Sequence, residues 1–243
     1  MKPINKTIRV FAPASSANLG CGFDVMGMAL DGIGDVLRIA ISEGDGLTIR
    51  NTSAAELPED IEKNVITPAV RAFMAAAGKK ACLEIVVEKK IRPGSGIGSS
   101  AASSAAAVFG LNELYGRPFP LPELVPFAME GEKLISGTAH ADNSAPAVMG
   151  GIVLIRGYQP LDMVRLPVPD SFCFSVIHPH IVVSTKAARD VLRKEIPMRE
   201  AVIQWGNVGG LVAGIMTGDL PLIGRSMRDV VAEPYRKGFI PGY

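Results

Sequence analysis

Residues 93–101 read Pro93-Gly94-Ser95-Gly96-Ile97-Gly98-Ser99-Ser100-Ala101. They lie between a run typical of a strand, 83–88, and an alanine-rich run typical of a helix, 101–107. A glycine-rich turn that opens a helix presents unpaired backbone N–H groups at the positive end of the helix dipole, where a phosphate group binds well. Glycines have no side chain, so the backbone can approach such a ligand closely. The segment therefore predicts a nucleotide-binding loop.

The spacing of this loop differs from the two better-known phosphate-binding patterns. No lysine precedes the serine pair, as GxxxxGK[ST] requires, and glycines at 94, 96 and 98 do not fit GxGxxG. A tight strand-to-helix turn built of small residues is the structural alternative. The pair Ser99-Ser100 favours function, because a serine hydroxyl can cap the helix or bind a magnesium ion or a phosphate oxygen.

Composition narrows the possible classes of protein. The 243 residues carry a formal net charge of +1, which gives no electrostatic footprint for nucleic acid or an acidic membrane surface. No apolar run approaches the ~20 residues of a membrane span, and the first residues are too polar for a secretory signal. The three cysteines are widely spaced and odd in number, which argues against a disulfide framework or a zinc site. We expect a protein of the reducing cytoplasm.

The order of elements favours an α+β fold, because strands and helices mix without a regular βαβ repeat. A loop is expected over 13–24, a hairpin turn at 44–46, and a domain boundary at 157–160, which divides the chain into domains 1–157 and 158–243. Thr67 is expected to cap a helix. The expected strands are 8–11, 36–41, 47–50, 83–88, 152–155 and 172–177; the expected helices are 67–77, 101–115, 123–135, one opened by Ser184-Thr185, 198–216 and 223–231.

Four polar clusters could carry chemistry, and each has a structural alternative. Asn18 and Asp24 could be turn residues, and Glu132 could belong to a solvated helix face. Asp142 and Asn143 could cap a helix. Arg189 and Arg236 could be surface charges. The clusters are Asn18 with Asp24; Glu132 with His140-Ala141-Asp142-Asn143; Ser184-Thr185-Lys186-Ala187-Ala188-Arg189; and Glu233-Pro234-Tyr235-Arg236-Lys237.

Taken together, the clusters suit phosphoryl transfer, which needs positioning and charge neutralisation more than covalent help. The glycine loop supplies donors to phosphate, and Glu132 with a loop serine can hold magnesium. Arg189 and Arg236 can bind a carboxylate in bidentate fashion, and Asp and Asn side chains can orient a hydroxyl or an ammonium group.

Five segments of the chain resemble the homoserine kinases, a branch of the GHMP kinase superfamily. Residues 13–24 resemble the first motif of that branch, 93–101 the phosphate-binding loop of the superfamily, and 140–146, 184–189 and 234–236 further segments of the branch. The resemblance runs in order along essentially the whole chain. It implies two α+β layers, with an N-terminal nucleotide-binding domain like ribosomal S5 domain 2 and a ferredoxin-like C-terminal domain.

The resemblance also implies an activity: ATP and L-homoserine give O-phospho-L-homoserine and ADP, on the route to threonine. It places ATP on Pro93, Gly94, Ser95, Gly96, Ile97, Gly98, Ser99, Ser100 and Ala101, and Mg²⁺ on Ser100 (or Ser99) and Glu132. It places the amino acid on Asn18, Asp24, Asn143, Arg189 and Arg236, and it implies that Asp24, Asn143 and Arg189 are the catalytic residues. It implies a homodimer and assigns no firm catalytic base, although Asp24 could take that role by proximity.

Two departures from the family pattern stand out. Cys21 occupies a position where the family usually has proline, and the sequence lacks the third, glycine-rich motif that follows the Pro-Tyr-Arg segment in relatives. We therefore expect a truncated second domain with an uncovered apolar face. Two other functions remain open: a GHMP kinase for shikimate or mevalonate, and a nucleotide-binding module without catalysis.

Overall fold

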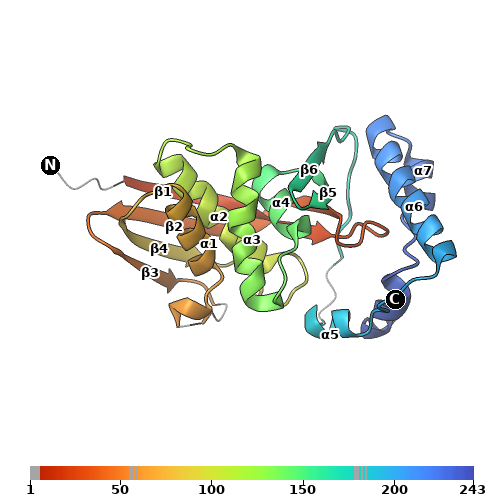
Figure 1. Ribbon diagram of the computed structural model, residues 1–243, viewed down its shortest axis with the longest axis horizontal. Coiled ribbons are helices and arrows are strands. Elements are labelled where there is room, and N and C mark those ends of the chain that lie inside the picture. The colour runs from red at the N-terminus through yellow and green to blue at the C-terminus, as the bar shows by residue number, and fades with distance from the viewer. Residues whose placement is uncertain (1–5, 55–56, 59, 178–180, 182, 184) are drawn as a thin grey trace.

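The computed structural model describes residues 6–54, 57–58, 60–177, 181, 183 and 185–243. A six-stranded sheet forms its centre, in the order β3-β4-β2-β5-β6, with β1 paired along β2 (Figure 1). β2 is the longest strand at 17 residues, so one end pairs with β4 and the other with β5. The strands are β1 (Lys6–Ala17), β2 (Met26–Ser42), β3 (Gly46–Asn51), β4 (Cys82–Glu88), β5 (Ile152–Tyr158) and β6 (Leu161–Leu166).

Four helices cover one face of this sheet (Figure 1). They are α1 (Ile66–Ala76), α2 (Ser99–Leu114), α3 (Leu121–Ser136) and α4 (Ala141–Met149). The central helix, α2, is buried along most of its length because alanine, serine and glycine allow close packing on the strands. At Gly110, for example, a methyl group would lie 2.6 Å from Ile39 Cδ1. The sheet and helices together confirm the α+β class.

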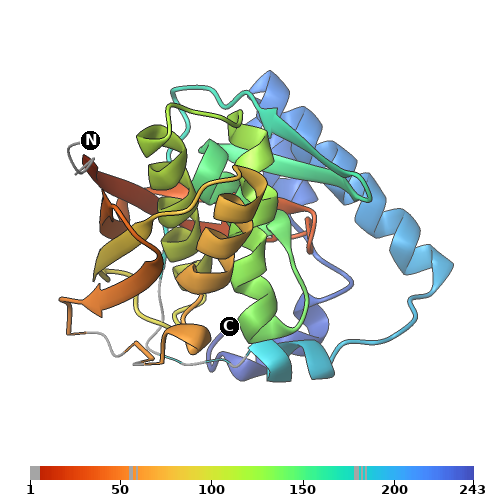
Figure 2. The same cartoon turned by 60° about the vertical axis from the view of Figure 1, so that its left-hand side comes forward.

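The remaining helices follow β6 and lie at one end of the sheet (Figures 1 and 2). The α6 face that carries Met198, Val202 and Trp205 is largely exposed, with 72%, 49% and 58% of each residue accessible to solvent. The uncovered apolar face expected from the sequence is therefore present. These elements are α5 (Thr185–Asp190), α6 (Met198–Thr217), α7 (Leu220–Ser226), α8 (Glu233–Arg236) and a 3₁₀ turn at Lys237–Phe239; another 3₁₀ turn, Ile61–Lys63, precedes α1.

The structure corrects the sequence prediction around β1 and β2. β1 continues to Ala17, so the loop expected over 13–24 begins only at Asn18. The hairpin expected at 44–46 is wrong, because β4 lies between β2 and β3 and pairs with β3 in parallel. The hairpin error has a physical cause: β3 pairs with β4, from Gly46 with Cys82 onward, and local propensity does not reveal a partner that distant in the sequence.

Three further expectations also differ from the structure. Residues 172–177 form no strand, and Thr67 does not cap α1 but donates from Oγ1 to the carbonyl oxygen of Ile61 at 2.5 Å. The helix expected over 223–231 instead spans Leu220–Ser226.

The turn at 157–160 joins β5 to β6 within one sheet. The two-domain division stays a prediction, and this pairing would move its boundary beyond Leu166.

Candidate active site

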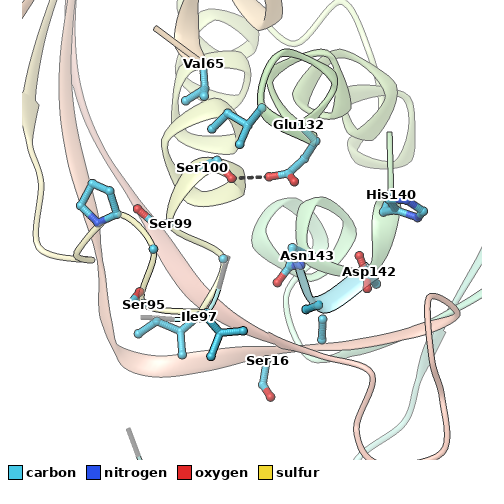
Figure 3. A pocket seen from close by; sticks show the side chains of 18 of the residues that line it. Ser16, Val65, Ser95, Ile97, Ser99, Ser100, Glu132, His140, Asp142 and Asn143 are labelled. Carbon is cyan, nitrogen blue, oxygen red and sulfur yellow. Dashed lines mark hydrogen bonds between the residues drawn. The ribbon is translucent and has the colours of Figure 1, made fainter. Parts of the chain in front are cut away.

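A cavity of about 770 Å³ opens where the glycine loop, the start of α4, the loop after β1 and the C-terminal helices meet. Figure 3 shows side chains of the glycine loop and of the start of α4 around it, with Ser95 and Ile97 on one side and His140 and Asp142 on the other. Its walls include Asn18, Asp24, Glu132, Asn143, Arg189, Arg236 and every residue from Pro93 to Ser100. Ala101 does not line it, because this residue is fully buried inside α2. Ser184 lies outside the described residues.

The glycine loop has the backbone conformation that its sequence predicts. Gly94, Gly96 and Gly98 have φ values of +76°, +77° and +68°, a region that residues with a side chain rarely adopt. Gly98 is the N-cap of α2, and a methyl group there would lie 2.0 Å from Ser15 Oγ. Ser15 Oγ in turn donates to Asn143 Oδ1 at 2.8 Å. The loop is thus packed directly against β1 and α4.

Ser100 and Glu132 meet inside the cavity, as the dashed line in Figure 3 shows. Ser100 Oγ donates to Glu132 Oε1 at 2.5 Å. Burial raises the pKa of Glu132, and the hydrogen bond from Ser100 opposes that shift. The solvated helix face considered for Glu132 is therefore wrong; its neighbours Glu130 and Lys133 form an ion pair on the exposed side instead.

Asp24, which also lines the cavity, is held in place by two other residues. Asn18 Oδ1 accepts a hydrogen bond from the Asp24 backbone N–H at 3.0 Å, and Arg189 binds the Asp24 carboxylate through both terminal nitrogens. Asn18 and Asp24 have φ values of +71° and +58°, which costs free energy in residues other than glycine. Strained backbone of this kind clusters at functional sites.

The second arginine reaches the same place from α8. Arg236 Nε donates to the carbonyl oxygen of Ala188 at 2.7 Å, next to Arg189 in the chain. The ring of Phe23 lies against both guanidinium groups, with centroid distances of 5.8 Å to Arg189 and 4.7 Å to Arg236. Burial and the charge of Arg189 lower the pKa of Arg236. Two cations so close together favour an anionic ligand.

His140 and Asp142 also line this cavity, although sequence reasoning gave neither a role of its own. Asp142 is buried in the first turn of α4, and burial together with the charges of Asp24 and Glu132 raises its pKa to about 7. His140 Nδ1 lies 3.7 Å from Asp24 Oδ2, and burial lowers the pKa of the imidazole. Their position in the motif 140–146 was the signal that could have found them.

Comparison with known proteins supplies the decisive observation. A homoserine kinase from Chlorobium phaeovibrioides is 46% identical over 98% of this chain and 78% of its own length. One from Methanococcus maripaludis is 38% identical over 98% of this chain and 79% of its own. This chain belongs to the homoserine kinases. The wider family description, GHMP kinases N terminal domain, matches residues 64–151.

Solved structures agree with this membership in the homoserine kinase family. The crystal structure of homoserine kinase from Cytophaga hutchinsonii superposes with a TM-score of 0.90 at 46% identity, and covers all of this chain and 78% of that one. A mevalonate kinase from L. major superposes with a TM-score of 0.66 at 18% identity, which shows a shared fold alone. Among the described helices, none has the length and apolar character needed to cross a bilayer.

Proposed function

We propose that this chain transfers the terminal phosphoryl group of ATP to the side-chain hydroxyl of L-homoserine, giving O-phospho-L-homoserine and ADP. The observation that carries the proposal is the 46% identity to a homoserine kinase over 98% of the chain, together with the one cavity that unites the motif residues. Mevalonate kinases share the fold at low identity, so fold alone does not favour mevalonate as the substrate.

The glycine loop is the proposed site of the ATP phosphates, over Pro93 to Ser100. Its backbone N–H groups precede α2, whose dipole favours an anion at this end. Ser95 Oγ adds support, because it is a buried hydroxyl with no hydrogen-bond partner among the described residues. A buried polar atom without a partner is costly, and a phosphate oxygen would satisfy it.

Ser100 and Glu132 are the proposed ligands of Mg²⁺. Their donor set fits, because magnesium prefers oxygen and is commonly held by one or two carboxylates together with substrate phosphates. Within the described residues no three His, Cys, Asp or Glu side chains gather to form a metal cage, so phosphate oxygens would complete the shell. When bound, the ion would neutralise charge that develops on the transferred phosphoryl group.

Arg189 and Arg236 are the proposed binders of the homoserine carboxylate. Arg189 Nε is buried and has no hydrogen-bond partner among the described residues, so it has a donor left for a ligand. Asp24 and Asn143, with Asn18 supporting the loop, would orient the ammonium group and the hydroxyl. Because Arg189 and Asn18 hold Asp24 in place, we assign it to orientation rather than to proton transfer.

Release of ADP, measured by a coupled assay with homoserine, shikimate and mevalonate as acceptors, tests the proposal. We expect turnover with homoserine and much weaker signals with the other two alcohols. Turnover of shikimate or mevalonate alone would overturn the assignment. Tight ATP binding without turnover of any alcohol would instead identify a nucleotide-binding module. The homodimer implied by the family resemblance is a separate proposal, which sedimentation analysis would test.

A further inference from the structure

Lys89 lies at the end of β4, just before the glycine loop, where a lysine would be expected to bind phosphate. Its surroundings do not fit that role. The side chain is only 3% exposed, and Nζ donates to Asp35 Oδ2, to the carbonyl oxygen of Ser99 at 2.5 Å and to Ser103 Oγ at 2.8 Å. An ammonium group has three donors, so this set of partners leaves none for a ligand.

Asp35, the partner of Lys89, is fully buried in β2. Its Oδ1 accepts hydrogen bonds from the backbone N–H groups of Lys90 and Ile91, both at 3.0 Å. Its Oδ2 accepts from Lys89 and from Ser103 Oγ, the latter at 2.9 Å. Both carboxylate oxygens are thus used, and one of them fixes the backbone where the glycine loop begins.

The ion pair therefore joins the two ends of the loop. Asp35 holds the start of the loop, and Lys89 holds Ser99, the first residue of α2. A direct hydrogen bond also links the two ends of the loop: Ser99 Oγ donates to the carbonyl oxygen of Ile91 at 3.1 Å. Between these anchors lie three glycines, which by themselves permit many backbone conformations.

We propose that Asp35 and Lys89 are positioning residues that clamp the glycine loop in its nucleotide-binding shape, and that Lys89 is not a phosphate ligand. The inference rests on the proposed function, since it assigns the ATP phosphates to this loop. A buried ion pair is seldom the most stabilising solution, because desolvation offsets much of its attraction. The presence of this ion pair is therefore better explained by the loop geometry that it fixes than by a contribution to the free energy of unfolding.

The variant Asp35→Asn distinguishes a clamp from a direct contact between Lys89 and phosphate. The amide can still accept from the loop backbone but loses the attraction for Lys89. If the pair acts as a clamp, the glycine loop loses its fixed shape in this variant. We therefore expect the dissociation constant of MgADP, measured by calorimetry, to rise about tenfold. The KM for homoserine should stay within about twofold of the wild-type value. If Lys89 were instead a phosphate ligand, the freed ammonium would bind MgADP as tightly as before or more tightly, which would overturn the proposal.

Ser103→Ala provides a second variant that removes no charge and keeps the chain folded if Asp35→Asn does not. It deletes one partner of both Asp35 and Lys89, so the clamp predicts a rise of about fivefold in the MgADP constant. An unchanged constant in folded Ser103→Ala would contradict the clamp. The matched control is Asn112→Ala, which removes buried hydrogen bonds to Phe119 at the far end of α2 and should lower the melting temperature without changing MgADP binding.

The two proposals can fail separately. If the wild-type chain does not phosphorylate homoserine, the proposed function falls, and the MgADP titrations still test the clamp. If the wild-type chain is active and Asp35→Asn binds MgADP normally, the clamp falls alone.

Discussion

The guanidinium of Arg189 in α5 and the carboxylate of Asp24 in the loop after β1 form a two-point ion pair, with distances of 3.1 Å (Nη1–Oδ2) and 2.9 Å (Nη2–Oδ1). The residues are 165 positions apart. The pair is partly buried, so solvent screens it less than it screens an ion pair on the surface. It ties the segment that carries α5 to the loop that carries Asp24, and both line the cavity.

Arg189→Lys should lower kcat/KM for homoserine about 30-fold, because a lysine cannot keep two parallel hydrogen bonds, and a hydrogen bond to a charged group contributes about 2 kcal/mol. Steady-state kinetics with varied homoserine would measure the effect. Arg156→Lys is the control, since Arg156 also pairs with a carboxylate, Asp162, but on the exposed β5–β6 hairpin. Equal losses in the two variants would contradict a special role for Arg189.

Glu132→Gln should raise the magnesium concentration needed for half-maximal activity about tenfold, because the amide keeps the size of the side chain but not its charge. The raised pKa of Glu132 adds a pH effect: protons compete with magnesium, so the wild type should need more magnesium at acidic pH. Titration of MgCl₂ at several pH values would test both. Glu130→Gln, on the exposed side of α3, should behave as the wild type does.

Asp142→Asn should change how stability depends on pH. The pKa of Asp142 is raised from 3.8 to about 7 in the folded chain, so the folded state binds more protons than the unfolded state between these values. This contribution to stability is complete below about pH 4 and is lost as the pH rises to about 7, at about 1.4 kcal/mol per pKa unit as an upper limit. The neutral amide should flatten that slope.

Urea unfolding at pH 5, 6.5 and 8 would measure this difference for the wild type and Asp142→Asn. The free energy of unfolding of Asp142→Asn should increase relative to that of the wild type as the pH rises. A constant gap across the three pH values would show that Asp142 titrates normally.

Gly98→Ala should impair both folding and nucleotide binding. The positive φ of Gly98 disfavours alanine, and the added methyl would lie 2.0 Å from Ser15 Oγ. Gly116→Ala is a matched control, because Gly116 has φ +81° but nothing within 4 Å of an added methyl. We expect the control to lose about 1 kcal/mol of its free energy of unfolding. Gly98→Ala should lose clearly more and should also have a raised KM for ATP. Thermal unfolding and kinetics would measure the two effects, and equal losses would argue against close packing at Gly98.

The sequence predicted those features of the fold and site that depend on neighbouring residues. The glycine loop and α2 were predicted because glycines permit a tight turn with positive φ, and the serines and alanines that follow favour the start and the body of a helix. The bounds of α6 were likewise predicted to within one residue. The motif at 13–24 indicated a functional segment, although its first five residues form part of β1 and not a loop.

Other features arise only from pairing between distant parts of the chain. The connection at 44–46 looks like a hairpin locally, yet β4 inserts between β2 and β3 because its apolar residues find partners on both sides. Asp142 is an ordinary helix-capping residue by sequence, and its raised pKa comes from burial among Asp24 and Glu132. The burial of Lys89 likewise goes with its ion pair to Asp35, which lies 54 positions away in the sequence.

By itself, the order of amino acids determined the phosphate-type loop, the long helices α1, α2, α3 and α6, and the membership suggested by the motifs. Each of these depends on short-range backbone preferences or on spacing along the chain. Tertiary structure alone decided which charges face each other and which are buried. Electrostatic energy depends on distance and on exclusion of water, and neither quantity exists until the strands and helices have packed.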